Sequence, residues 1–378
     1  MLILFDINLK RKTLFWLCLF VGIFFLFTST GASAETFDTD SATIQNSDVF
    51  EELEITVPFL PAGGTDVWAR AVLPNLGQFL PGKPTISFKN ISGSRGHRAA
   101  NDYARLKPLD GRSLFVIAAS MNIAYLLEDE RVRYDLSDWQ ALMSYNAGIV
   151  VYASENLGIT DIKDLKNNKE HLIMASIGPT SEDLFVLLAL DILKIDITSI
   201  FGLGGRGAAR KMFESGDVNV DFQTTPAFKK FVAPLVSEHK ATPLFSLGAF
   251  DSDMNYVRDP LYPDLPNLEE VYIELYGSAP SSKAWQAWLS LYRASKGTLK
   301  FLVIPKDTPK NIINAYQNAI DLMMKDPFLL ENLNSQIGEN TVFGPVEAQK
   351  RIEDLIALPM ETRVWLKQWI YNKYEIRI

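Results

Sequence analysis

Three short segments place glycines between a predicted strand and a predicted helix, a pattern that is typical of anion-binding loops. The first runs through Gly63 and Gly64, the second through Gly93 and Gly96, and the third through Gly178. The first N–H groups of a helix have no partner within it, and the helix dipole favours negative charge there. Glycine also has no Cβ atom to block an approaching ligand. Each segment alone fits an ordinary strand–helix turn, but the three together predict a site for a small anion.

Hydroxyl side chains accompany these glycines. We expect Thr65 to cap the first of the three helices and Ser181 to cap the third, and Ser176 and Thr180 add hydroxyl donors to the third segment. In open α/β sheets, ligands bind beyond the carboxyl ends of the strands. The three segments are therefore expected to converge.

Two arginines have the side chain that best recognises a carboxylate. Arg95 lies within the second segment, where a ligand contact and a surface position are equally compatible with the sequence. For Arg206, which opens a later helix, we expect a solvated surface side chain rather than a ligand contact.

Strands alternating with helices must position these loops. Short β-branched runs predict strands at 55–59, 85–89, 113–119, 149–153, 172–176, 198–201 and 218–222. Helical patterns begin near Thr65, Gly96 and Lys310 and cover 181–194, 206–215, 346–358 and 361–374. This alternation indicates βαβ units and parallel sheets.

The chain is expected to cross twice between two lobes. One crossing is predicted near Ala147, and the other in the proline-rich stretch 259–266. Residues 55–147 together with 266–378 would form the first lobe, and residues 148–265 the second. Two crossings predict a hinge.

The N-terminus has the layout of a cleaved secretory signal peptide. A basic stretch, 10–12, precedes the apolar run 14–27, and Ala32-Ser33-Ala34 forms an A-x-A cleavage site. The run is shorter than the ~20 residues of a membrane span. We therefore expect cleavage after Ala34, a flexible leader at 35–54, and an exported protein.

The amino-acid composition excludes several classes of function. The single cysteine lies in the signal peptide, so the mature chain would have no thiol or disulfide chemistry. Residues 1–34 contain three basic residues and one acidic residue, so their removal changes the formal charge from −8 to −10. An acidic chain argues against nucleic acid as a partner. We expect no cofactor and no metal, because the three histidines are scattered and no hydrolase motif is present.

One other motif points to a different class of protein. Residues 202–207 read Gly-Leu-Gly-Gly-Arg-Gly and match G-x-G-x-x-G, and Asp221 follows at the distance typical of dinucleotide-binding folds. An exported dinucleotide-binding oxidoreductase is thus an alternative. A receptor that presents its ligand to a sensor, without transport, is another.

The order of these motifs resembles that of the substrate-binding receptors of tripartite tricarboxylate transporters, the Bug-type periplasmic proteins. The resemblance rests on 57–70, the Gly93/Gly96 loop, Pro-Leu-Asp-Gly at 108–111 and 176–184, followed by 216–227 and 264–268. It implies a two-lobed α/β periplasmic binding protein fold of type II-like form, each lobe a mainly parallel sheet flanked by helices. It also implies a monomeric, non-enzymatic receptor that closes over a small organic carboxylate and delivers it to membrane transporter subunits.

Positions carried over from the resemblance, together with the loop residues, give one set of candidate ligand contacts. They are Phe59, Ala62, Gly63, Gly64, Thr65, Asp66, Gly93, Ser94, Arg95, Ser120, Ser176, Gly178, Thr180, Ser181, Thr224 and Thr225. The chain departs from the family at Thr180 (usually glycine), Asp183 (commonly histidine), Asn219 (commonly aspartate), and at Arg95 and His97, which stand in a loop that is usually small. Residues 274–299, with Trp285 and Trp288, resemble an added helical segment.

Overall fold

The fold of the chain comes from a computed structural model. It describes residues 51–61, 63–251, 253–295, 298–337 and 342–378. The predicted signal peptide, most of the predicted leader and Ala62 lie outside these residues. Strand β1 begins at Glu52, so 52–54 belong to the sheet and not to the leader.

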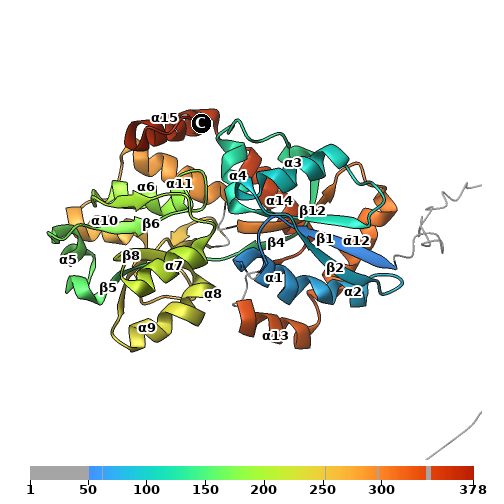
Figure 1. The fold of residues 1–378 in the computed structure, drawn as a ribbon, viewed down its shortest axis with the longest axis horizontal. Coiled ribbons are helices and arrows are strands. Elements are labelled where there is room, and N and C mark those ends of the chain that lie inside the picture. Colours follow the sequence, from blue (N-terminus) through green and yellow to red (C-terminus); the bar gives the residue numbers. More distant parts are fainter. Residues whose placement is uncertain (1–50, 62, 252, 296–297, 338–341) are drawn as a thin grey trace, which may run out of the picture. The chain divides into compact units, whose positions relative to one another are not determined.

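The first sheet is mixed and has six strands in the order β13-β4-β12-β3-β1-β2 (Figure 1). Its strands are β1 (Glu52–Val57), β2 (Thr85–Asn90), β3 (Ser113–Ala118), β4 (Trp139–Asn146), β12 (Thr298–Pro305) and β13 (Val342–Phe343). The pairs β1–β2 and β1–β3 are parallel, whereas β12 runs antiparallel to both β3 and β4. The expectation of a mainly parallel sheet is therefore wrong here, because β4 and β12 have no counterpart among the predicted strands.

The second sheet is also mixed and has the order β7-β6-β8-β5-β9. Its strands are β5 (Ile149–Ser154), β6 (Ile173–Ala175), β7 (Thr198–Ile200), β8 (Val220–Thr224) and β9 (Ala241–Ser246). Strand β6 is parallel to β7 and β8, and β5 is antiparallel to β8 and β9. The chain leaves the first sheet after Asn146 and enters the second at Ile149.

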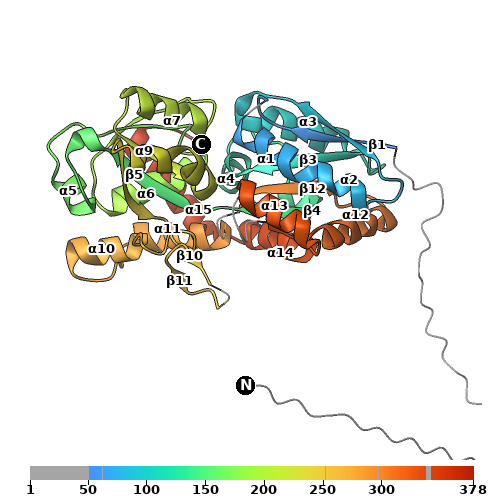
Figure 2. The ribbon, with the colours of Figure 1, turned by 90° about the horizontal axis from the view of Figure 1, so that it is seen from below.

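Helices cover both faces of the sheets. In the first half of the chain they are α1 (Gly64–Val72), α2 (Leu76–Phe79), α3 (His97–Leu106), α4 (Ala119–Leu126), α5 (Ile162–Asn167), α6 (Asp183–Ile192), α7 (Arg206–Ser215), α8 (Thr225–Ala227) and α9 (Ala233–Ser237). The later ones are α10 (Leu268–Tyr276), α11 (Lys283–Ser295), α12 (Lys310–Met323), α13 (Pro327–Ile337), α14 (Pro345–Ile356) and α15 (Met360–Tyr374). A short hairpin, β10 (Ala249–Phe250) and β11 (Tyr256–Val257), lies beside α11 (Figure 2).

Alternation along the strands explains the layers. Leu114 and Val116 of β3 pack in the core that faces α1 and α12, while Phe115 and Ile117 pack in the core on the opposite face. Successive strand side chains point to opposite faces, so a strand with apolar residues at every position must be covered on both sides. This is the burial that the continuous apolar run of β3 predicts.

The last helices contact elements of both sheets. The indole N–H of Trp288 on α11 donates to the carbonyl of Phe185 on α6 (2.9 Å), and α11 also contacts α14 and α15. Trp369 of α15 donates to Asp191 of α6 (2.8 Å). The predicted helical segment near 274–299 thus contributes aromatic core, and the assignment of 266–378 to the first lobe stays a prediction.

Candidate functional site

The first glycine segment leads into α1 without a side-chain cap. The helix begins at Gly64 with Gly63 in an extended conformation at the N-cap position, and among the described residues no side-chain cap bond is formed at Gly63. The expectation that Thr65 caps this helix is wrong, because Thr65 already lies in its first turn. Neither glycine offers a side chain to this helix start, where the backbone dipole favours negative charge.

Asn90 joins the first segment to the second. Its amide nitrogen donates to the carbonyl of Phe59 and to Asp66 Oδ1, both at 2.9 Å, and its oxygen accepts from Arg70 Nη2 at 3.0 Å. Asp66 is buried and is also paired with Arg70. The Asp66 carboxylate therefore helps to position the two loops.

The second segment has a strained backbone. Gly93, Ser94, Arg95 and Gly96 all have positive φ values, of 127°, 48°, 54° and 94°. Such values are rare for residues with a side chain and persist only where the surroundings enforce them. Ser120 does so here, because its hydroxyl donates to the carbonyl of Arg95 (3.2 Å). Ser120, a candidate ligand contact, is buried and fixes this loop.

The third segment is held by its own hydroxyls and by Asp183. The Asp183 carboxylate accepts from Ser176 Oγ and from the amide of Ile177, both at 2.5 Å. Ser181 Oγ donates to the carbonyl of Gly178 (2.7 Å) and accepts from the amide of Asp183 (3.3 Å). The helix starts at Asp183 with Glu182 at the N-cap position, so the expectation that Ser181 is the N-cap is wrong by one residue, although its hydroxyl still accepts from the amide of Asp183.

The second and third segments meet at Arg95. Its Nη1 donates to Thr180 Oγ1 at 3.0 Å, and a Cβ atom placed on Gly178 would lie 2.7–2.9 Å from the guanidinium. A Cβ atom at position 178 would displace the end of the Arg95 side chain, and the φ of 146° at this position also favours glycine. The convergence of these two segments, expected from the sequence, is therefore a feature of the structure.

A second guanidinium, which the sequence analysis missed, reaches the same hydroxyl. Arg131 Nη2 lies 3.5 Å from Thr180 Oγ1, and Arg131 is paired with the buried carboxylate of Asp129. In the sequence, Glu128–Arg131 is an ordinary charged run, and no spacing rule distinguishes it from a solvated surface. Only the fold shows that Arg131 points to the third segment.

The charges around Thr180 leave one cation without a carboxylate partner. Among the described residues, Arg95 forms no ion pair, and burial together with the nearby charge of Arg131 lowers the pKa of Arg95. Burial followed by the charge of Arg131 lowers the pKa of His97 to about 4, so His97 is neutral at pH 7. Arg131 is paired with Asp129, and the carboxylates of Asp129 and Asp183 lie near enough to favour the charged form of Arg95 without forming an ion pair with it.

Thr224 and Thr225 lie at the end of β8, close to the crossing between the sheets. The amide of Thr225 donates to the carbonyl of Gly148 (2.9 Å). Thr225 Oγ1 is buried, and within the described part of the chain it has no hydrogen-bond partner. Thr225 is only 1% exposed, so the ligand contact expected for this position stays a prediction.

Arg206 is neither a surface side chain nor available to a ligand. It is buried, pairs with Asp221 and donates to the carbonyls of Ala175 and Phe222, both at 2.9 Å. Its guanidinium also lies 3.6 Å from the ring centre of Phe222. The expectation of a solvated arginine is wrong because α7 directs the side chain into the second lobe.

The same contacts argue against the dinucleotide alternative. Asp221 is buried and is engaged by Arg206 and by Tyr152 (2.5 Å), so its carboxylate is not free for a ribose hydroxyl. Strand β6 lies between β7 and β8, whereas the dinucleotide motif joins neighbouring strands. The glycines at 202–207 therefore serve the entry into α7.

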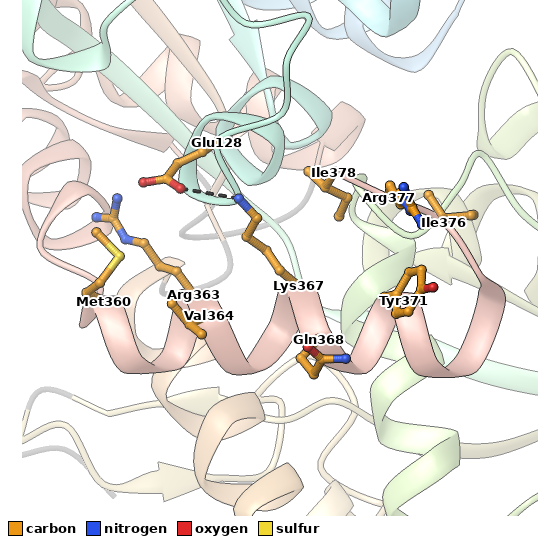
Figure 3. A pocket seen from close by; sticks show the side chains of 10 residues that line it. All are labelled: Glu128, Met360, Arg363, Val364, Lys367, Gln368, Tyr371, Ile376, Arg377 and Ile378. Atoms are coloured by element: carbon orange, nitrogen blue, oxygen red, sulfur yellow. Dashed lines mark hydrogen bonds and ion pairs between the residues drawn. The ribbon is translucent and has the colours of Figure 1, made fainter.

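Two cavities in the described part of the chain lie away from the glycine loops. The larger, about 1140 Å³, is lined by the crossing residues Asn146–Gly148 and by parts of α11 and α14. The smaller, about 360 Å³, lies along α15 (Figure 3). Within the described ranges, no three metal-ligating side chains come together, and no helix has the length and apolar character of a membrane span.

Structures of periplasmic binding proteins share this fold. MatC (Rpa3494) from Rhodopseudomonas palustris with bound malate matches with a TM-score of 0.61 at 19% identity, over 84% of this chain and 98% of that chain. R. palustris Rpa4515 with adipate matches with 0.63 at 18%, over 85% and 96%. The periplasmic binding protein BugD matches with 0.60 at 18%, over 86% and 98%.

These likenesses are structural. No family model matches the sequence, and no curated protein is significantly similar to it. The expectation of a two-lobed α/β periplasmic binding protein fold is confirmed, and the solved structures that share it include a Bug protein, as the motif order predicts.

Proposed function

We propose that this protein is a periplasmic receptor that captures a small organic carboxylate and delivers it to membrane transporter subunits. The observation that carries the proposal is Arg95, a guanidinium held between two glycine loops with a hydroxyl as its only hydrogen-bond partner among the described residues. A carboxylate would supply the charge that Arg95 lacks. The uncapped amides of α1 would receive the same or a second carboxylate group.

The donors of such a site can supply the binding free energy that a micromolar ligand needs. A micromolar ligand needs about −8 kcal/mol. Hydrogen bonds to a charged group contribute roughly 1.5–3 kcal/mol each, and a helix N-terminus adds roughly 0.3–1 kcal/mol. Four or five aimed donors therefore suffice after the ordering costs of binding.

The structural neighbours support this ligand class. MatC is described with bound malate and Rpa4515 with adipate, both small dicarboxylates. Because the identities are below 20%, the specific ligand of this chain follows from its own side chains, above all Arg95, Arg131 and Thr180. We propose a binding role without catalysis, since the polar groups of the loops are used for positioning.

A thermal-shift assay with mono-, di- and tricarboxylates tests the proposal. A ligand at about 100 times its Kd stabilises the folded state by about 2.7 kcal/mol, which raises Tm by several degrees. Stabilisation by NAD with no response to any carboxylate would instead favour the dinucleotide alternative.

The export step has its own test. We propose cleavage after Ala34, so protein recovered from the periplasm should begin at Glu35 when its N-terminus is sequenced. A chain that keeps residues 1–34 and stays with the membrane would contradict the signal peptide and leave the binding site unaffected.

A further inference from the structure

A groove on the C-terminal helix combines basic and apolar side chains at the surface. Figure 3 shows this groove along α15. We call it the α15 face, and its main residues are Met360, Arg363, Val364, Lys367, Tyr371 and Arg377. Met360, Val364 and Tyr371 are 57%, 58% and 42% exposed, which is high for apolar residues that follow one another along a single helix.

The charge of the α15 face is opposite to that of the whole chain. It carries three cationic side chains and one carboxylate, Glu128, whereas the full chain has a formal charge of −8. Lys367 is bonded to Glu128 (3.2 Å), Arg363 donates to the carbonyls of Ile356 and Leu358, and Arg377 lies over the ring of Tyr371. Two of the three cations therefore have no carboxylate partner among the described residues.

Helix α15 is anchored to elements of both lobes. Lys367 reaches Glu128, just after α4, which follows a strand of the first sheet. Trp369 and Lys373 both donate to Asp191 of α6, at 2.8 Å each. The position of this helix therefore depends on both lobes. A partner bound on it could distinguish a receptor that has captured its ligand from one that has not.

We infer that the α15 face is a docking surface for a protein partner that presents an acidic segment with apolar side chains. The cations would pair with its carboxylates, and Met360, Val364 and Tyr371 would receive its apolar groups. We take the partner that carries this segment to be a membrane transporter subunit, and this part of the inference rests on the proposed function.

Co-sedimentation with membranes of the organism that makes the protein tests the docking. The variant is Val364→Glu/Arg377→Glu, which leaves Arg363, Trp369 and their structural bonds in place. Its matched control is Leu322→Glu/Lys325→Glu on the surface around the end of α12, because Leu322 is 54% exposed and the charge change is the same. We expect the α15 variant to bind about tenfold more weakly, and the control to bind like the wild type.

Three further measurements distinguish a protein partner from a lipid surface. Treating the membranes with protease should abolish sedimentation, and raising the salt concentration should weaken it. Wild-type protein that instead sediments with protease-treated membranes or with phosphatidylglycerol vesicles would overturn the inference in favour of a lipid surface. Equal binding of the α15 variant and the control would overturn it as well.

The ligand-induced thermal shift separates this inference from the proposed function. We expect the α15 variant to keep the full shift with carboxylates while receptor-dependent uptake by spheroplasts is lost. If no carboxylate shifts the wild type, the proposed function fails, and the sedimentation result still decides the docking.

Discussion

Arg95 Nη1 lies 3.0 Å from Thr180 Oγ1, although the two residues are 85 positions apart in the chain. Arg95 belongs to a loop of the first sheet, and Thr180 to a loop of the second. Both positions depart from the pattern of the family that the sequence resembles. In that family the loop that holds Arg95 is usually small, and position 180 is usually glycine. These two positions contact each other in this chain.

Removing the Arg95 guanidinium should weaken dicarboxylates more than monocarboxylates. Loss of a charged hydrogen bond costs about 1.5–3 kcal/mol, so Arg95→Ala should raise the Kd of a dicarboxylate by about 10- to 100-fold. Calorimetry on matched pairs such as succinate and butyrate measures this. Arg105→Ala on the exposed part of α3 is the control, and an equal loss for both ligand types would show that Arg95 does not recognise a second carboxylate.

Adding a methyl group at Gly178 should remove the contact between the loops. In Gly178→Ala the new Cβ would meet the Arg95 guanidinium, and the residue would keep a φ that costs about 1–3 kcal/mol. Gly202→Ala is the control, since Gly202 also has positive φ but faces open space. In urea unfolding, Gly178→Ala should lose more stability than Gly202→Ala.

A double-mutant cycle then isolates the contact. Once Arg95 is already alanine, Gly178→Ala should cost no more than Gly202→Ala does, because the clash partner is gone. Full additivity of the Arg95→Ala and Gly178→Ala effects would mean that the two residues do not interact in solution.

Removing the buried Arg206 should be strongly destabilising. Arg206→Met leaves Asp183 and Asp221 buried without their cation, and breaking a buried pair from one side costs about 3–5 kcal/mol. Circular dichroism during urea unfolding measures the change, with Arg105→Met as the surface control. Adding Asp221→Asn to Arg206→Met should restore part of the loss, and an Arg206→Met protein as stable as the control would contradict the buried network.

His97 should make stability fall in mild acid. Burial holds the pKa of His97 at about 4 in the folded chain, against about 6.5 when unfolded. Between these values the unfolded chain binds a proton that the folded chain does not, so the free energy of unfolding falls as the pH drops from about 6.5 to about 4. The full loss is about 3 kcal/mol.

Thermal unfolding from pH 7.5 to 4.5 measures this loss in the wild type and in His97→Asn. The asparagine variant removes the titrating group while keeping a donor near Tyr134, which lies 3.3 Å from His97 Nδ1. Its stability should decline less over this range, and parallel curves for the two proteins would exclude His97 as the source.

The elements were predictable where a single local pattern decides them. The helix at 206–215 has the predicted bounds, and those at 361–374 and 346–358 differ from the predicted bounds by one or two residues. Amphipathic spacing is visible in the sequence of 206–215 and 346–358. Strands β4 and β12 escaped prediction, and with them the mixed nature of the first sheet. Their antiparallel pairing joins residues more than 150 positions apart, as for Thr298 and Asn146, and no local signal encodes it.

The residues and spacing of the sequence determined that three glycine loops stand between strands and helices, and that an anion is the ligand class that suits them. Backbone freedom at glycine is a local property, so it can be predicted from the chain itself, whereas the missing side-chain cap of α1 was not predicted. Only the tertiary structure decided that Arg131 joins Arg95 at Thr180, that Ser120 fixes the strained loop, and that Arg206 is buried with Asp221. The direction of a long charged side chain depends on which neighbours surround it, and those neighbours come from distant parts of the sequence.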